Sequence, residues 1–307
     1  MKVVMYHYIS SFNKNFPFFN QLDTSIFKKQ IKNLEKKFGI IKNENEIYEN
    51  NEKILLTFDD GLKDHLQAAK VLKKIKKTGI FFIPTQPFKD KKILNVHKSH
   101  LILGKIKPHI ALKELKLFIR LNKLKTKIND IEKKNKNLYK KFNKFTNDFN
   151  NHQNDNKNKK EFKKMINYLS KDTNIQTKVL DYLLKKFKIK KDIKDIYLSL
   201  NEIKKISKMG MIIGSHSHTH KLLSKLSYPE QEYEIKSSKK FLEKLLNKKI
   251  KFFCYPYGGE KSYNKNTIKL LKKNKFRNSF SVKSLDVSSK DLKLKPFEIS
   301  RYDCIEF

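Results

Sequence analysis

Cysteine is scarce in this chain, and long hydrophobic runs are missing. The two cysteines, Cys254 and Cys304, cannot build a disulfide framework and fit a reducing compartment. No stretch approaches the ~20 apolar residues that a membrane-spanning helix needs. The opening Met1–His7 also lacks the apolar core and cleavage site of a signal peptide. We therefore expect a soluble, cytoplasmic protein.

Arginine is almost absent, although the chain is strongly basic. Lysine and arginine number 70 against 31 acidic residues, a formal net charge of +39, yet the only arginines are Arg120, Arg277 and Arg301. Phosphate and nucleic-acid sites favour the planar, bidentate guanidinium, whereas lysine here is dispersed among asparagine. We therefore expect no specific nucleic-acid partner, and a basic surface that could rest on an anionic membrane or glycan.

The apolar residues, although only 38% of the 307, include 23 Phe and 13 Tyr, enough for a sizeable core. Short apolar runs alternate with helical patterns toward both ends, which predicts βα units and a parallel sheet or barrel. Strands are expected at Lys2–Tyr6, Ile54–Phe58, Gly79–Pro84, Met211–Ile213, Ile250–Cys254 and Phe276–Val282, with a final apolar segment at Pro296–Arg301. Helices are expected at Thr24–Lys37, Lys63–Lys77, Leu200–Lys208, Pro229–Leu246 and Tyr263–Lys273.

Residues 88–198 differ in composition, being rich in Lys and Asn. Apolar residues recur there at helical spacing, as in Leu112 and Leu115 and again in Leu180 and Leu183. We predict a helical insertion that divides one barrel into a first part, 1–87, and a remainder, 199–307. The stretch Asn150–Lys160 has nothing apolar to bury and is typical of a loop.

Two adjacent carboxylates follow an apolar strand in the segment Leu55–Gly61 (LLTFDDG). Enzymes built from βα units keep their active sites at the C-terminal ends of strands, where Asp59 and Asp60 fall. Successive side chains of a strand point to opposite faces, so both carboxylates can serve one site only if the strand ends there. Gly61 permits such a break. A solvated Asp-Gly turn is the alternative interpretation.

Three of the nine histidines alternate in the segment Ile213–His220 (IGSHSHTH), which indicates a metal site. An extended chain would point His216, His218 and His220 the same way, whereas a helical turn would bring the outer two together and turn His218 aside. Two histidines and one aspartate would supply three ligands and leave positions for water and substrate, as in catalytic zinc sites. Non-haem iron oxygenases use the same set.

The segments Thr57–Gly61 and His216–His220 resemble the first two motifs of the polysaccharide deacetylase family, the NodB-homology domains of carbohydrate esterase family four. Phe253–Gly258 (FCYPYG) resembles the third motif, and the three occur in family order, each after an expected strand. The resemblance covers about Met1–Thr85 and Leu200–Arg301. It implies an α/β fold, a distorted (β/α) barrel of parallel strands of the NodB type.

The resemblance also implies roles for individual residues. Asp60, His216 and His220 would hold a divalent metal ion, and we expect zinc because it is a Lewis acid without redox chemistry. Asp59 would be the general base that acts on water acidified by this cation. The backbone N–H of Tyr255 would help the metal to hold the tetrahedral oxyanion. The middle histidine of the second motif falls at a variable position and receives no role.

No histidine follows His220, whereas the family usually carries a C-terminal histidine that protonates the departing amine. Our candidate for this general acid is His7. It follows an apolar run just as Asp59 does, so both should emerge at the same end of a parallel barrel. The opening Met5–His7 also resembles circularly permuted members of the family, whose acid-bearing segment is N-terminal. A histidine that only caps a strand end is the alternative interpretation.

Arg301 follows another short, partly apolar segment. It could pair with Asp59 and hold that carboxylate ionised and oriented, a role that the family gives to an arginine in a different motif. An arginine on the surface is the alternative.

Together these features predict a metal-dependent hydrolase that removes an N-acetyl group from an amino sugar of a glycan or glycan precursor. Two other hypotheses stay open: a binding protein for an anionic polymer on a degenerate barrel, and an amidase that acts on a non-sugar C–N bond. The intact set of Asp59, Asp60, His216 and His220 argues against binding alone, because binding does not need a base beside a metal.

Overall fold

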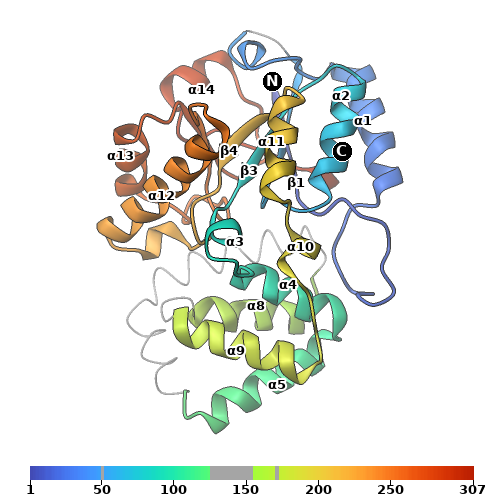
Figure 1. Cartoon of the computed structure of the whole chain (residues 1–307), viewed down its shortest axis with the longest axis vertical. Coiled ribbons are helices and arrows are strands. Elements are labelled where there is room, and N and C mark those ends of the chain that lie inside the picture. Colours follow the sequence, from blue (N-terminus) through green and yellow to red (C-terminus); the bar gives the residue numbers. More distant parts are fainter. Residues whose placement is uncertain (50–51, 125–154, 170–172) are drawn as a thin grey trace. The chain divides into compact units, whose positions relative to one another are not determined.

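The structure, a computed structural model, describes residues 1–49, 52–124, 155–169 and 173–307 (Figure 1). It divides into two compact units. The barrel unit comprises Met1–Phe12, Gln21–Lys92 and Asp192–Phe307, and the helical unit comprises Asn13–Asn20 and Ile93–Lys191. Among the described residues, no helix is long and apolar enough to cross a membrane.

Seven parallel strands form the sheet of the barrel unit, in the order β6-β5-β4-β3-β2-β1-β7. They are β1 (Lys2–Tyr6), β2 (Ile54–Phe58), β3 (Gly79–Ile83), β4 (Ile212–Ser215), β5 (Phe252–Cys254), β6 (Asn278–Phe280) and β7 (Tyr302–Asp303). The C-terminal segment touches both edges, because Ile299 bridges to Phe280 of β6 and Tyr302 pairs with Val4 of β1. The sheet therefore curls into the expected distorted barrel.

Helices surround these strands, as Figure 1 shows for α1, α2, α11, α12 and α13. The helices of the barrel unit are α1 (Thr24–Phe38), α2 (His65–Lys74), α3 (Gln86–Lys89), α10 (Ile193–Ile196), α11 (Leu200–Lys208), α12 (Tyr228–Leu246), α13 (Lys265–Lys273) and α14 (Ser289–Leu294). Three short 3₁₀ turns accompany them at Asn45–Ile47, Leu223–Lys225 and Cys304–Glu306. Capping residues determine where several of these helices begin. Helix α12, for example, begins at a Ser227–Glu230 capping box with proline in its first turn.

Strands β1, β2 and β3 are buried on both faces from Val3 onward, which explains their continuous apolar runs. Alternate residues such as Val4 and Leu56 pack in one cluster with residues of the surrounding helices. The residues between them, such as Val3 and Leu55, belong to a second cluster with Phe82 and other strand residues. Because side chains alternate along a strand, this second cluster fills the barrel interior.

The predicted strands at Lys2–Tyr6 and Ile54–Phe58 are confirmed residue for residue, and the other predicted elements agree to within a few residues. The final apolar segment expected at Pro296–Arg301 contains the bridge at Ile299, and the last strand, β7, follows directly after it at Tyr302–Asp303.

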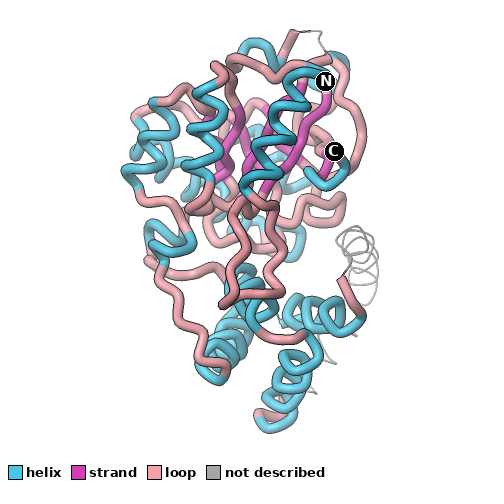
Figure 2. Tube along the Cα trace, turned by 90° about the vertical axis from the view of Figure 1, so that its right-hand side faces the viewer, coloured by secondary structure: helices cyan, strands magenta, loops and turns pink. Residues whose placement is uncertain are grey.

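The helical unit contains α4 (Asn95–Lys105), α5 (Pro108–Leu121), α8 (Lys157–Leu169) and α9 (Thr173–Lys186), and Figure 2 shows only helices and loops in its described part. Helix α5 packs on α8, and α4 packs on α9. The first part of the loop predicted at Asn150–Lys160, up to residue 154, lies outside the described residues. From Lys157 onward the prediction is wrong, because the chain there is helical: Phe162 and Ile166 are buried, and Asp155 pairs with Lys159 one turn into the helix.

Candidate active site

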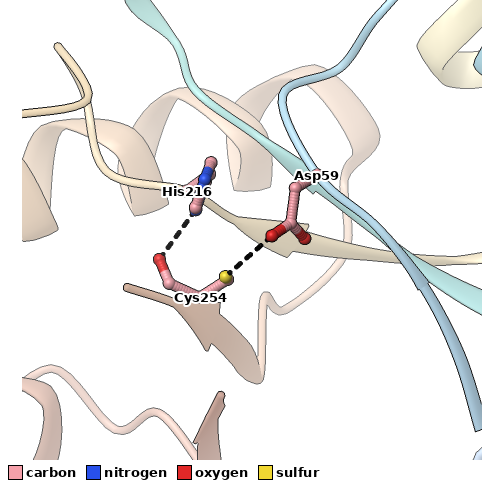
Figure 3. Close-up of side chains that lie close together, drawn as sticks. All are labelled: Asp59, His216 and Cys254. Carbon is pink, nitrogen blue, oxygen red and sulfur yellow. Dashed lines mark hydrogen bonds between the residues drawn. The ribbon is translucent and has the colours of Figure 1, made fainter. Parts of the chain in front are cut away.

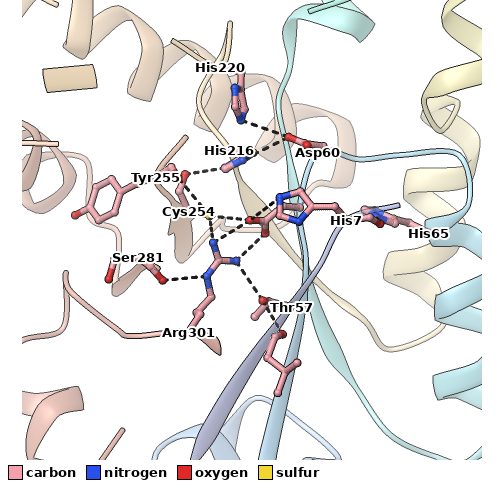
Figure 4. A network of polar contacts seen from close by, with 12 residues as sticks. His7, Thr57, Asp60, His65, His216, His220, Cys254, Tyr255, Ser281 and Arg301 are labelled. Atoms are coloured by element: carbon pink, nitrogen blue, oxygen red, sulfur yellow. Dashed lines mark hydrogen bonds and ion pairs between the residues drawn. The ribbon is translucent and has the colours of Figure 1, made fainter. Parts of the chain in front are cut away.

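Loops from several strands meet at the C-terminal edge of the barrel (Figure 4). Tyr6 pairs with Phe58 in register, so the next residues, His7 and Asp59, emerge side by side as predicted. The N–H of Asp59 donates to the Tyr6 carbonyl at 2.9 Å, which continues the ladder by one residue. This edge therefore collects the charged residues of the sequence motifs.

Asp59 and Arg301 form a buried, two-pronged ion pair. The two terminal nitrogens of Arg301 donate to Oδ1 and Oδ2 of Asp59 at 2.8 and 2.9 Å, and each residue is at most 2% exposed. Arg301 also donates to the Thr57 hydroxyl and the Ser281 carbonyl, both at 3.2 Å. Because Thr57, Asp59 and Arg301 alternate with residues that face outward, all three point into the barrel. Arg301 thus pairs with Asp59 in the structure, and its two hydrogen bonds fix the orientation of the carboxylate.

This pairing decides the charge of Asp59. Burial on its own would raise the pKa of the carboxyl group, but the charge of Arg301 and the nearby His216 outweigh it and lower the pKa from 3.8 to about 2. Asp59 is therefore ionised at neutral pH. Burial opposes the positive charge of Arg301 as well, but Asp59 more than compensates and raises the pKa of the guanidinium.

We expect Arg301→Met to lower the free energy of unfolding by about 3–5 kcal/mol, because Asp59 would stay buried without its partner. Urea unfolding measures the loss, and exposed Arg120→Met, expected to change stability by about 0.5 kcal/mol or less, is the matched control. The depressed pKa of Asp59 means that wild type gains this stability above pH 3.8 and loses it as the pH falls toward 2. A loss below about 1 kcal/mol, as for a surface pair, would contradict the interpretation.

Asp60, His216 and His220 converge beside this pair. Oδ1 of Asp60 lies 3.5 Å from Nε2 of each histidine, and the two imidazole rings are 4.8 Å apart. All three side chains are buried, and their ligand atoms lie within 4.8 Å of one another. The Nδ1–H of His216 donates to the Cys254 carbonyl at 2.8 Å, so its Nε2 carries a lone pair directed at the cluster. Burial lowers the pKa of His216 despite both aspartates, which keeps it neutral and able to ligate.

The backbone brings these side chains together through left-handed residues. Asp60 has φ 82° and Gly61 has φ 61°, so the strand breaks one residue earlier than the predicted Gly61. The second motif forms neither the extended chain nor the helical turn that we considered. It is a loop in which Ser217 (φ 63°) and His220 (φ 57°) are left-handed. For residues other than glycine this conformation is costly, and it is common at functional sites.

His218 points away from the cluster. Its Nδ1 lies 2.9 Å from the Thr85 hydroxyl, and its Nε2 lies 3.6 Å from Oδ2 of Asp90. Its backbone N–H donates to Glu234 at 2.9 Å. His218 therefore anchors the loop to the segment that follows β3, and the expectation that it turns aside agrees with this placement.

Cys254 is part of the site, although we did not predict a role for it. Asp59, His216 and Cys254 form a second group whose ligand atoms lie close together (Figure 3). The Cys254 Sγ lies 3.4 Å from Asp59 and 3.0 Å from the Arg301 guanidinium. A guanidinium at that distance would repel a metal ion, and burial raises the pKa of the thiol well above its usual range. This second group is therefore the poorer candidate for a metal.

His7 lies on the open side of Asp59. Its Nε2 is 3.9 Å from Oδ2 of Asp59, and 36% of its side chain is exposed. Tyr257 lies beside the cluster of Asp60, His216 and His220, with its ring 5.2 Å from that of His220. Burial, with a contribution from Asp60, raises the pKa of the Tyr257 phenol to about 12.

The structure corrects the expectation for Tyr255. Its backbone N–H already donates to the Phe280 carbonyl at 3.2 Å, because the β5–β6 ladder continues one residue beyond Cys254. Its phenol is also occupied, donating to the Phe297 carbonyl at 2.8 Å inside the core. Tyr255 is therefore a packing residue in this structure and does not offer an oxyanion donor.

Sequence reasoning missed Cys254, Tyr257 and Thr85 at or around the site. Two of them lie in the FCYPYG segment, where only Tyr255 was assigned a role. Thr85 could have been found as a polar residue that follows strand β3 at the same edge as the other motifs.

The model of the polysaccharide deacetylase family matches residues 176–279, which include His216, His220 and the FCYPYG segment. No curated protein sequence matches the chain. Three solved structures share its fold at low identity. Deacetylase PplD from Streptococcus pyogenes, in complex with acetate, has a TM-score of 0.57 and 15% identity, and the match covers 99% of this chain and 91% of that one.

The two other structures are similar to the same extent. For IcaB from Ammonifex degensii the TM-score is 0.55 at 14% identity, with 98% and 89% of the two chains covered. For a de-N-acetylase from Aggregatibacter actinomycetemcomitans the TM-score is 0.55 at 12% identity, with 99% and 95% covered. The family model matches one segment of the chain, and the solved structures share its fold, so the chain is similar to polysaccharide deacetylases in sequence over residues 176–279 and in its barrel fold.

Proposed function

We propose that the protein is a metal-dependent hydrolase that removes the N-acetyl group from an amino sugar of a glycan or glycan precursor. The observation that carries the proposal is the arrangement of two kinds of group at one edge of the barrel. Asp60, His216 and His220 form a ligand set, and directly beside it Asp59 is held by Arg301 and faces His7. The acetate complex of PplD and the de-N-acetylase among the similar structures support the reaction.

The donor set fits a divalent cation. Two imidazole nitrogens and one carboxylate oxygen converge, the His216 tautomer is fixed by the Cys254 carbonyl, and the set leaves coordination positions open. When bound there, such a cation would acidify water and polarise the acetyl carbonyl. We favour zinc, because nitrogen and oxygen ligands suit it and because hydrolysis needs a Lewis acid without redox chemistry.

Asp59 takes a proton from the attacking water in this proposal. Its pKa of about 2 makes it a weak base, so it holds the proton only briefly. Arg301 therefore acts by keeping the carboxylate ionised and fixing its orientation, which matters because proton transfer requires defined geometry. The nearest titratable group on its open side is His7, 3.9 Å away.

His7 gives a proton to the departing amine. An amine is a poor leaving group unless it is protonated, so amide hydrolysis needs a general acid on the leaving-group side. The imidazole of His7 is partly exposed at the site and can face a large substrate, whereas His65 and His218 are buried in other contacts.

The test is acetate release by the purified protein from a panel of N-acetylated glycans, combined with elemental analysis of the same sample. Acetate release from at least one glycan, with a metal bound, supports the proposal. Hydrolysis of simple non-sugar acetamides without any glycan would favour the amidase instead. Absence of both reactions from metal-loaded protein would favour the binding protein on a degenerate barrel.

We expect His7→Ala to slow hydrolysis of an N-acetyl amide by about 10²–10⁴-fold, the usual contribution of a general acid. The metal content should not change. An aryl acetate, whose leaving group departs without protonation, should be much less affected. Rates on both substrates measure the difference, and equal slowing of amide and ester would remove His7 from the acid role.

A further inference from the structure

The segment that carries His7 is held by a second histidine. His65, the first residue of α2, is fully buried and contacts the rings of Phe58 and Phe81 edge-on, with centroids 5.8 and 5.9 Å away. Its Nε2 lies 2.9 Å from the backbone carbonyl oxygen of His7, and Figure 4 shows its ring beside the His7 segment. His65 thus reaches from the helix after β2 to the chain after β1.

The direction of this hydrogen bond is fixed. A carbonyl oxygen can only accept, so Nε2 of His65 must carry the proton. Among the described residues, Nδ1 of His65 has no hydrogen-bond partner. Burial lowers the pKa of this imidazole, so it stays neutral. His65 is therefore a fixed donor to the backbone of His7, and Oδ1 of Asp64 lies 3.9 Å from the same ring nitrogen.

Asp64 holds the same segment at its other end. The backbone N–H of Ile9 donates to Oδ2 of Asp64 at 2.7 Å. Asp64 stands at the N-cap of α2, where an aspartate normally accepts from the helix's own first N–H groups, but it makes no such bond. Asp64 and His65 thus hold the N–H of Ile9 and the carbonyl of His7, the backbone groups on either side of Tyr8.

Packing alone does not explain the choice of histidine. The site is lined by Phe58 and Phe81, and an apolar side chain would fill it without an unsatisfied nitrogen. A buried polar atom without a partner is destabilising. What histidine adds is one donor aimed at the backbone of the residue that faces Asp59.

We propose that His65, with Asp64, is a positioning residue that fixes the backbone of His7 and so keeps its imidazole beside Asp59 in line with the departing amine. This inference rests on the acid role of His7 in the proposed function. His65 itself does not touch the substrate, and it acts through His7 alone.

The experiment compares three substitutions at His65 on an N-acetyl amide and an aryl acetate. The side-chain amide of Gln places an N–H donor near the position of Nε2 of His65. The shorter amide of Asn places its donor nearer to Nδ1, and Leu has no donor. We expect His65→Leu and His65→Asn to lower kcat on the amide by about 10–100-fold through misplacement of His7, with little effect on the ester. His65→Gln should restore most of the amide rate. His109→Leu, at an exposed histidine of α5, is the control and should leave both rates unchanged.

A double substitution separates positioning from general stability. In the His7→Ala background, His65→Leu should cause no further loss on the amide, because the two residues act as one unit. Equal slowing of amide and ester by His65→Leu, or the same loss in both backgrounds, would overturn the inference. His7→Ala without a selective effect on the amide would overturn the acid role and this inference together. A selective effect in His7→Ala but not in His65→Leu would overturn the inference alone.

Discussion

Asp59→Asn is expected to lower kcat for acetate release by about 10²–10⁴-fold, because it removes the only proposed acceptor for the proton of the attacking water. The metal content should stay close to that of wild type, since Asp59 is paired with Arg301 at 2.8 and 2.9 Å and is not proposed as a ligand. Acetate assays and elemental analysis on the same preparation measure both effects.

The control for this substitution is Asp286→Asn. Asp286 is also paired with a cation, Lys2 at 2.6 Å, but on the surface, where 59% of its side chain is exposed. Turnover of the control should equal that of wild type. Urea unfolding must accompany the assay, because Asp59→Asn leaves Arg301 buried without its anionic partner. Loss of the metal from folded Asp59→Asn would mean that Asp59 ligates, or that the two carboxylates have exchanged roles.

The strands could be predicted wherever burial alone determines them. β1 and β2 are apolar on both faces, so their sequences are short continuous apolar runs bounded by polar residues. β7 could not be located in this way. It has only two residues, both partly exposed, and it becomes a strand because closure of the barrel brings Tyr302 against Val4. Helix α8 was missed at its start, because its first residues are polar and its stability comes from Phe162 and Ile166 further along.

The composition of the site could also be predicted, but not its backbone geometry. Parallel register alone places His7 beside Asp59, since Tyr6 pairs with Phe58. The left-handed conformations of Asp60, Ser217 and His220 could not be predicted from residue type, because even Asp and His, which favour this region more than most residues, adopt it at a minority of positions. They depend on contacts made only in the folded loop, such as the hydrogen bond that the His220 N–H donates to the Ser217 hydroxyl at 3.1 Å.

The oxyanion role expected for Tyr255 failed for a similar reason. Whether a backbone N–H is free depends on where a neighbouring strand stops, and here the ladder to Phe280 extends past the end of β5. The position of Tyr255 in the sequence motif does not show whether its backbone N–H is free. The contact of Cys254 with Asp59 and Arg301 likewise arises only when the ends of β2, β5 and the C-terminal segment meet inside the barrel.

His216→Ala and His220→Ala are each expected to abolish most metal binding, whereas His218→Ala should retain it. Each of the first two removes one of the three proposed ligands, whose donor atoms lie within 4.8 Å of one another. His218 instead contacts Thr85 and Asp90, outside this set. Elemental analysis after dialysis measures the bound metal directly.

A second measurement does not depend on activity. Zinc that binds only the folded protein raises the free energy of unfolding, by about 2.7 kcal/mol at a hundredfold excess over Kd. This stabilisation should disappear in His216→Ala and His220→Ala and persist in His218→Ala. The last variant should nevertheless start about 1–3 kcal/mol less stable, because the buried Thr85 hydroxyl loses its imidazole partner. Equal loss of zinc stabilisation in all three variants would show that the segment binds with three histidines, and the ligand set of Asp60, His216 and His220 would then be wrong.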